Sequence, residues 1–271
     1  MMDFFRYPWI MIKENFINTG RTVEMSLKEL NKRYSGAALG AFWALVKPLL
    51  FIGVYWFAVS VGIRGGKDIN EHPYILYLVA GIIPWFFISE TLVYAGKSLR
   101  NNKHLVTKMV YPVSTIPTFS VLSQLYVHLV MTFIVVVIFA LAGQAPNLYY
   151  LQLLYYSFAM FVFMTVLSWT TSALIVVSRD FEHLIKSVTQ MLFWLTPIIW
   201  HIGNVTGVLK LVVMANPINY FVSGYRDSLL NQRWFYDNLG YTFYFWGVTI
   251  TLALVGAFLF GKLKDEFADI L

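Results

Sequence analysis

Long apolar segments recur along this chain, six of them near the length at which a helix crosses a bilayer. A membrane-spanning helix needs about 20 apolar residues, and only helices and closed barrels satisfy every backbone group in lipid. Charged residues are correspondingly scarce at 13%, whereas soluble domains carry about 25%. The sequence therefore predicts an all-α polytopic membrane protein with six transmembrane helices.

One membrane domain is expected over residues 35–271, because no polar stretch is long enough for a second core. Residues 205–230 are apolar but are interrupted in the middle by Asn216 and Pro217. Since proline removes a backbone donor and blocks the preceding turn, this stretch predicts a re-entrant helical hairpin on the outer side, before the last span. The spans themselves are expected near residues 38–62, 74–96, 117–142, 149–177, 187–201 and 241–261.

The distribution of basic residues predicts the orientation. Residues 1–34 place apolar side chains at mostly helical spacing among cations, which indicates an interfacial amphipathic helix on the cytoplasmic leaflet. With six spans, the connections on that side carry fourteen Lys and Arg residues and the opposite connections carry five. Cytoplasmic loops hold the excess of positive charge, so both termini are expected in the cytoplasm and the protein in the plasma membrane. Anionic lipid also accounts for the net charge of +6, and no nucleic-acid partner is expected.

The sequence predicts no catalytic or metal site in this chain. No phosphate-binding glycine-rich loop of the G-x-x-x-x-G-K-[ST] type occurs, so the chain is not expected to hydrolyse ATP alone. It has no cysteine, and its five histidines are scattered without the spacing of metal ligands. No cofactor is therefore expected on this chain.

Two ionisable residues lie at membrane depth in the expected spans, Lys47 in the first and Glu90 late in the second. Such a group costs at least about 2.5 kcal/mol at the centre of a spanning helix, so each requires an explanation. Lys47 either meets an anionic head group entering from the cytoplasm, or snorkels or pairs with Glu90. A proton-coupled carrier would carry a longer series of such groups, so secondary transport is disfavoured.

Aromatic residues make up 18% of the chain, and several lie within the expected spans. Packing against lipid and interfacial anchoring explain most residues of this kind. The alternative is an aromatic lining along a substrate path, on which sugar rings can stack. Its candidates are Tyr55, Trp56, Phe86, Phe87, Phe193 and Trp194.

Two charged connections on the cytoplasmic side are candidates for docking a partner protein. The first follows the second span and is basic and helical in pattern over residues 99–109, and the second follows the fourth span. Any positive-inside loop shares such a charge, so the pattern alone does not identify a partner. The candidate coupling residues are Lys97, Arg100, Lys103, Lys108, Arg179, Asp180, Glu182 and Lys186.

Several longer motifs occur in one order along nearly the whole chain. They are WALVKPLL (residues 43–50), GIIPWFFISE (81–90), KHLVTKMVYPVSTIP (103–117), FWLTPIIW (193–200) and NPINYFVSGYRDSL (216–229). Together they resemble the permeases of type-2 ABC exporters of polysaccharides and polyol phosphates. Within that group the chain is most similar to the wall teichoic acid exporter permeases of Gram-positive bacteria, through Tyr55-Trp56-Phe57, Gly62-Ile63-Arg64 and GYTFYFWG (240–247).

This resemblance implies a function and an assembly that spacing alone does not show. Two permeases are expected to pair with two ATP-binding cassette subunits, which hold ATP and Mg. The complex is expected to move undecaprenyl-pyrophosphate-linked wall teichoic acid from the cytoplasmic to the outer face, with Lys47 and Arg100 as candidates for contacting the anionic carrier. The alternatives are export of another lipid-linked glycan, of the O-antigen or capsule type, and an intramembrane polyprenyl-sugar transferase using Asp68 and Glu71.

Overall fold

The structure is a computed structural model that describes residues 2–36, 39–63, 69, 72–107 and 111–271. The described chain is helical apart from turns and one isolated β-bridge between Ile69 and His72. Lys108, Asp68 and Glu71, which the sequence nominates for coupling and for the transferase alternative, lie outside the described residues.

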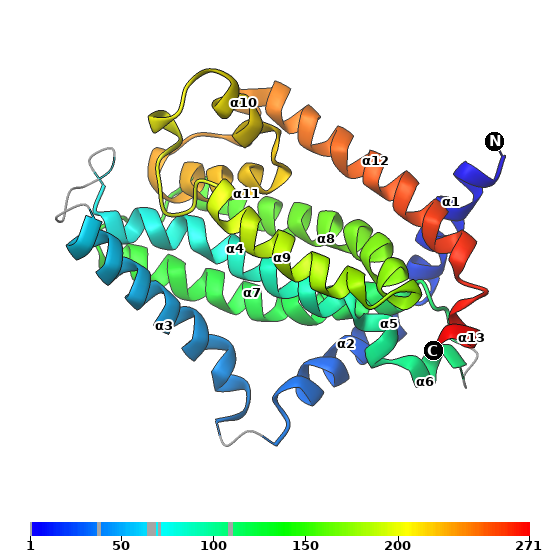
Figure 1. Cartoon of the computed structure of the whole chain (residues 1–271). Helices are drawn as coiled ribbons and strands as arrows, with labels where there is room; N and C mark the ends of the chain where they lie inside the picture. Colours follow the sequence, from blue (N-terminus) through cyan, green and yellow to red (C-terminus); the bar gives the residue numbers. More distant parts are fainter. Residues whose placement is uncertain (1, 37–38, 64–68, 70–71, 108–110) are drawn as a thin grey trace.

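Four long helices form the centre of the molecule: α4 (Tyr74–Gly96), α7 (Thr115–Leu141), α8 (Gln152–Val177) and α12 (Leu239–Leu263). Within the described residues, these four are long and apolar enough to cross a membrane, counting the short turns that lead into α8 and α12. The helix α4 packs against α7 and α8, and α12 packs against α8 (Figure 1). Four of the predicted spans are therefore present to within a few residues.

The first predicted span corresponds to α3 (Trp43–Phe57), which continues as a π-helical turn over Ala58–Ile63. The 15 residues of α3 are fewer than a helix needs to cross alone. Among the four central helices, it contacts mainly α4, and none of its residues is buried. This helix consequently has a long apolar surface that the rest of the described chain leaves uncovered.

The prediction of a span over residues 187–201 is wrong in its bounds. The helix here, α9 (Asp180–Leu195), begins seven residues earlier and stops before the predicted end. It begins early because the Ser178 hydroxyl accepts a hydrogen bond from the Asp180 backbone N–H. The carboxylates of Asp180 and Glu182 also stabilise this end of the helix, where the helix dipole is positive. It ends at Leu195 because Thr196 is extended, as residues before proline prefer.

The N-terminal segment forms two helices, where the sequence predicts one. α1 (Met2–Ile17) packs against α12 and α7, and α2 (Thr19–Tyr34) packs against α7. The side chain of Asn18 donates to the Glu14 carbonyl and that of Thr19 to the Phe16 carbonyl. Side chains that bond the preceding turn in this way compete with the helix and bend or end it.

Both termini lie at one end of the bundle (Figure 1). That end also carries α2 and three short helices, α5 (Ser98–Asn101), α6 (Lys103–Thr107) and α13 (Phe267–Ile270). We call it the basic end, because α1, α2, α5 and α6 together carry eight Lys and Arg residues. Since α9 starts here, the two charged connections of the sequence meet at the same end.

The apolar stretch 205–230 forms two helices, α10 (Gly207–Ala215) and α11 (Pro217–Arg226), which meet at Asn216 as predicted. The Asn216 side chain caps α11 by accepting from the Ile218 backbone N–H at 3.0 Å, and donates to Thr196 at 2.8 Å. α11 is buried against α4 and α8, while α10 is largely exposed. Entry of this hairpin into a membrane stays a prediction.

Candidate functional site

A groove of about 520 Å³ lies between α3, α4, α7 and α9. We call it the central groove. Seven of the nine substrate-path candidates line it: Lys47, Tyr55, Phe86, Phe87, Glu90, Phe193 and Trp194. These residues come from three helices that are far apart in the sequence, so the fold gathers one set of candidates into one cavity.

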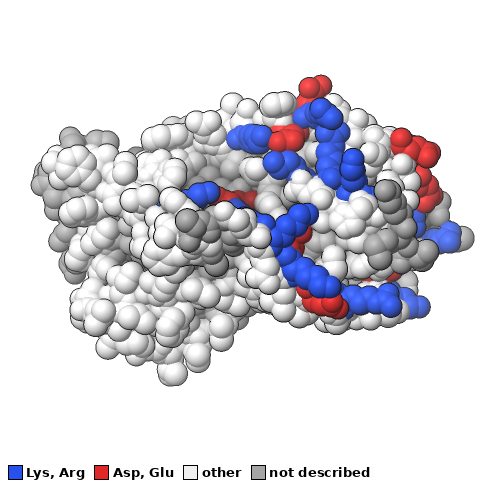
Figure 2. All heavy atoms as spheres, turned by 90° about the horizontal axis from the view of Figure 1, so that it is seen from below, with Lys and Arg blue, Asp and Glu red and all other residues white. Residues whose placement is uncertain are grey.

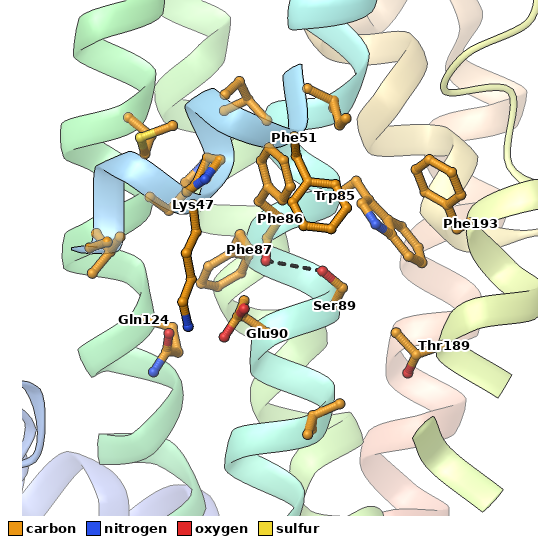
Figure 3. Close-up of a pocket in the computed structure, with 18 of the residues that line it drawn as sticks. Lys47, Phe51, Trp85, Phe86, Phe87, Ser89, Glu90, Gln124, Thr189 and Phe193 are labelled. Carbon is orange, nitrogen blue, oxygen red and sulfur yellow. Dashed lines mark hydrogen bonds between the residues drawn. The ribbon is translucent and has the colours of Figure 1, made fainter. Parts of the chain in front are cut away.

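Aromatic side chains form a continuous wall of the central groove (Figure 3). Phe51 on α3 stacks on Tyr55 and meets the edge of Phe86 on α4, with ring centroids 5.9 and 6.1 Å apart. Phe193 on α9 lies 5.3 Å from Tyr55 and 5.6 Å from Trp85. The wall therefore joins α3, α4 and α9, and offers ring faces and edges to whatever enters.

The end of the groove nearest the basic end is polar. Arg33, in the last turn of α2, forms an ion pair with Glu90 and donates to the Gln124 side chain. Lys47 points from α3 toward the same two acceptors (Figure 3), and Lys186 of α9 also lines the cavity. Since Lys186 is paired with Glu182 at 2.7 Å, three cations stand with two carboxylates, which leaves this mouth with an excess of one positive charge, suited to an anion.

Arg33 is a groove residue that the sequence analysis did not nominate. In the sequence it is one of several cations of an amphipathic helix, and only the packing of α2 on α7 brings it to Glu90. A second contact holds it, because its guanidinium lies 4.9 Å from the centre of the Tyr94 ring. Tyr94 in turn donates to the buried Glu29 at 2.8 Å, which ties α2 to α4.

Two nominated residues do not line the central groove. Trp56 lies next to Tyr55, about 100° further round α3, so its side chain faces outward and is exposed. Arg100 lies on α5, where it donates to the Val176 carbonyl at 3.3 Å. Arg100 is near Arg179, at the basic end. Burial and this neighbouring charge lower the pKa of Arg100.

The coupling candidates that the structure describes lie at the basic end, most of them in one cluster. Glu182, on the first turn of α9, pairs with Lys186 at 2.7 Å and with Lys97 at 3.4 Å. The hydrogen bond from Lys186 holds the pKa of the Glu182 carboxyl below its usual range. Arg179 and Asp180 are exposed beside this cluster, and Lys103 is exposed on α6. Figure 2 shows Lys and Arg gathered over one half of the molecule, with the other half of that face nearly free of them.

A family model described as an ABC-2 type transporter matches residues 22–230, which include most of α2, the central groove and the α10–α11 hairpin. The chain belongs to this family. ABC-2 transporter permeases pair with ATP-binding cassette subunits, so this chain is the membrane component of such an exporter. The match confirms the type-2 ABC transporter permease expected from the sequence motifs, and the narrower likeness to wall teichoic acid exporters stays a prediction.

Curated relatives of this ABC-2 permease align with it over almost its whole length. An O-antigen export system permease protein of Klebsiella pneumoniae is 27% identical over 253 residues, covering 92% of this chain and 94% of that protein. A protein of the same description from Myxococcus xanthus is 21% identical over 261 residues, covering 96% of this chain and 98% of that protein.

Proposed function

We propose that this chain is the permease of an ATP-driven exporter that moves a lipid-linked polysaccharide from the cytoplasmic to the outer face of the plasma membrane. The central groove is the observation that carries the proposal. Its positive mouth suits a pyrophosphate such as that of an undecaprenyl carrier, and its aromatic wall suits sugar rings. The names of the relatives, which concern O-antigen export, support the same class of cargo.

Among the glycans, the relatives favour an O-antigen type of polymer over wall teichoic acid, which the sequence motifs favour. Deletion of the gene in its native host, followed by chemical analysis of the surface polymers, separates the two. Loss of a phosphate-free polysaccharide identifies the O-antigen type, and loss of a polyol-phosphate polymer identifies teichoic acid. A surface with every polymer unchanged would contradict both.

The proposed assembly has two copies of this chain and two ATP-binding cassette subunits. α3 and α9 flank the central groove, and both leave large apolar side chains uncovered: Leu49, Leu50, Val54, Phe57, Leu184, Val188, Met191 and Leu195. A second copy would cover part of this surface and close the path around the polymer. Six membrane passages, with both termini in the cytoplasm, accord with the clustering of charge at the basic end.

Movement of the ATP-binding subunits is proposed to reach the groove through α9. This helix runs unbroken from Asp180, beside the charged cluster, to Phe193 in the aromatic wall. We expect the double replacement Arg179→Ala/Asp180→Ala to lower export at least about tenfold, while ATP hydrolysis continues and the complex can still be purified. Export and hydrolysis are measured together in membrane vesicles.

The matched control for this prediction is Lys264→Ala/Asp265→Ala, an adjacent pair of opposite charges that is exposed near the C-terminus. It should leave both activities unchanged. Unaltered export by the Arg179→Ala/Asp180→Ala variant would show that α9 does not carry the coupling.

A further inference from the structure

A second cavity, of about 400 Å³, lies at the opposite end of the bundle from the basic end. Its walls come from α11, from the start of α12, from the turns before α12, and from residues 197–202 after α9. We call it the outer pocket, since the proposed topology places it on the outer side. It shares no lining residue with the central groove, and the proposed export path does not use it.

The outer pocket is lined by buried amide and hydroxyl groups beside aromatic rings. Asn219 is 1% exposed, donates to the Tyr241 hydroxyl at 3.0 Å and accepts from Ser223 at 3.3 Å. The Tyr220 hydroxyl lies 3.1 Å from that of Thr242. Trp234 lines the same cavity. A few placed polar groups set among aromatic faces are the lining expected of a site for a small hydroxyl-rich ligand.

Basic residues are concentrated at this pocket although its side of the membrane has few of them. Of the five Lys and Arg residues that the charge distribution assigns to the outer side, Lys210, Arg226 and Arg233 line the outer pocket. Among the described residues that line it, Asp227 is the one carboxylate, and it interacts electrostatically with both arginines. The lining thus carries an excess of two positive charges.

The three cations have different roles. Arg226 is buried and binds backbone carbonyls of residues 197 and 198, so it holds the pocket wall together. Lys210 and Arg233 are exposed at the rim, and within the described part of the chain neither forms an ion pair. Exposed cations at the rim of a polar cavity, on the side of the membrane where the positive-inside rule disfavours them, are suited to bind a phosphate.

We propose that the outer pocket binds a carbohydrate phosphate. The hydroxyl groups of this ligand lie against Asn219 and Tyr241, and a face of its ring or chain packs on Trp234. Its phosphate lies between Lys210 and Arg233. The inference rests on the proposed function and extends it, because the pocket would receive a segment of the glycan on the outer face. Two segments share this chemistry: a polyol-phosphate repeat within the polymer, and the phosphoglycosyl end next to the lipid.

Binding is tested by saturation-transfer NMR on the full-length chain, assembled with its ATP-binding subunit in lipid nanodiscs. The probes are glucose 1-phosphate, glycerol 3-phosphate and glucose. We expect both phosphates to bind more tightly than glucose, and Lys210→Gln/Arg233→Gln to weaken their binding at least about tenfold, since charge-assisted hydrogen bonds are lost. Trp234→Ala should also weaken it. Preference for glycerol 3-phosphate points to a polymer repeat, and preference for glucose 1-phosphate points to the lipid-linked end.

Matched controls are Arg21→Gln/Lys264→Gln, which removes two exposed cations elsewhere, and Trp9→Ala, which removes an exposed indole. An unchanged melting midpoint establishes that the pocket variants are folded. Absence of binding to the unsubstituted complex, glucose binding equal to that of the phosphates, or full binding by the pocket variants would overturn the inference. Each of these outcomes leaves the proposed export intact, whereas a normal cell surface after gene deletion would remove the proposed function and leave measured binding in place.

Discussion

Replacement of Arg226 by alanine is expected to lower the free energy of unfolding by about 2 to 6 kcal/mol, because two buried carbonyl groups would each lose a donor at a cost of about 1 to 3 kcal/mol. The guanidinium is buried and donates to the carbonyls of Pro197 at 2.5 Å and Ile198 at 2.6 Å. It also lies 3.6 Å from the centre of the Tyr77 ring. Alanine would leave the two carbonyls without this donor, and the hydrogen bonds from Tyr74 to the Ile199 carbonyl and from Tyr77 to the Trp200 carbonyl would still connect this segment to α4.

The same contact explains the glycine at position 81 on α4. A Cβ atom there would come within 2.4 Å of an Arg226 nitrogen, which is closer than the two atoms can approach. Gly81→Ala is therefore expected to lower the stability of the unsubstituted protein. The same substitution should lower stability much less in a protein that already carries Arg226→Ala. Non-additivity of this kind is the signature of two positions in direct contact.

Both expectations are measured as thermal melting midpoints of the purified chain in one detergent. Arg21→Ala, which removes an exposed arginine of α2, serves as the control and should melt normally. The melting midpoint of Arg226→Lys should lie between those of Arg226→Ala and the unsubstituted protein, because an ammonium group does not reproduce the planar fork of a guanidinium. An Arg226→Ala protein with an unchanged midpoint would contradict this account of the network.

Charge reversal at Lys47 is expected to have the largest effect on export. Lys47 reaches from α3 toward Gln124 and Glu90 at the polar mouth of the central groove. Glutamate at this position would add a second carboxylate beside Glu90, so an entering pyrophosphate would meet repulsion in place of attraction. We expect export to fall at least about tenfold, since the reversal replaces an attraction of about 1 kcal/mol with a repulsion of about 1 kcal/mol even in water-like surroundings.

The Lys47 variant is compared with two others in the same export assay. Lys47→Arg keeps the charge and should retain most of the activity. Lys32→Glu reverses an exposed cation of α2 outside the groove lining and should export normally. Full export by Lys47→Glu, with normal amounts of protein in the membrane, would remove Lys47 from the substrate path.

The long central helices could be predicted from sequence because their apolar runs have the length that the bilayer demands. The bounds of α4 coincide with the predicted residues 74–96. α9 could not be placed in the same way, since its apolar run continues past Pro197 while the helix itself starts among charged residues at Asp180. Hydropathy follows the apolar run, whereas capping and proline set the ends of the helix.

The central groove was predictable in part. Lys47 and Glu90 stand out because charge at membrane depth is rare, and the structure brings both to one cavity. Arg33 cannot be recognised from sequence in this way, since cations are common on amphipathic helices. Glu90, with which Arg33 pairs, lies 57 positions further along the sequence. The outer pocket is harder still, because its aromatic and amide residues come from helices and turns spread between Tyr77 and Thr242.

Export itself is tested most directly by the side of the membrane on which lipid-linked glycan accumulates. The protein is depleted in its native host, the glycan is labelled through its precursor, and access of a membrane-impermeant glycan-modifying reagent is compared in intact cells and in inverted vesicles. The account predicts label that is accessible only from the cytoplasmic face, with a matching loss of polymer from the cell surface. Labelled glycan reaching the outer face at the normal rate without this protein would contradict it.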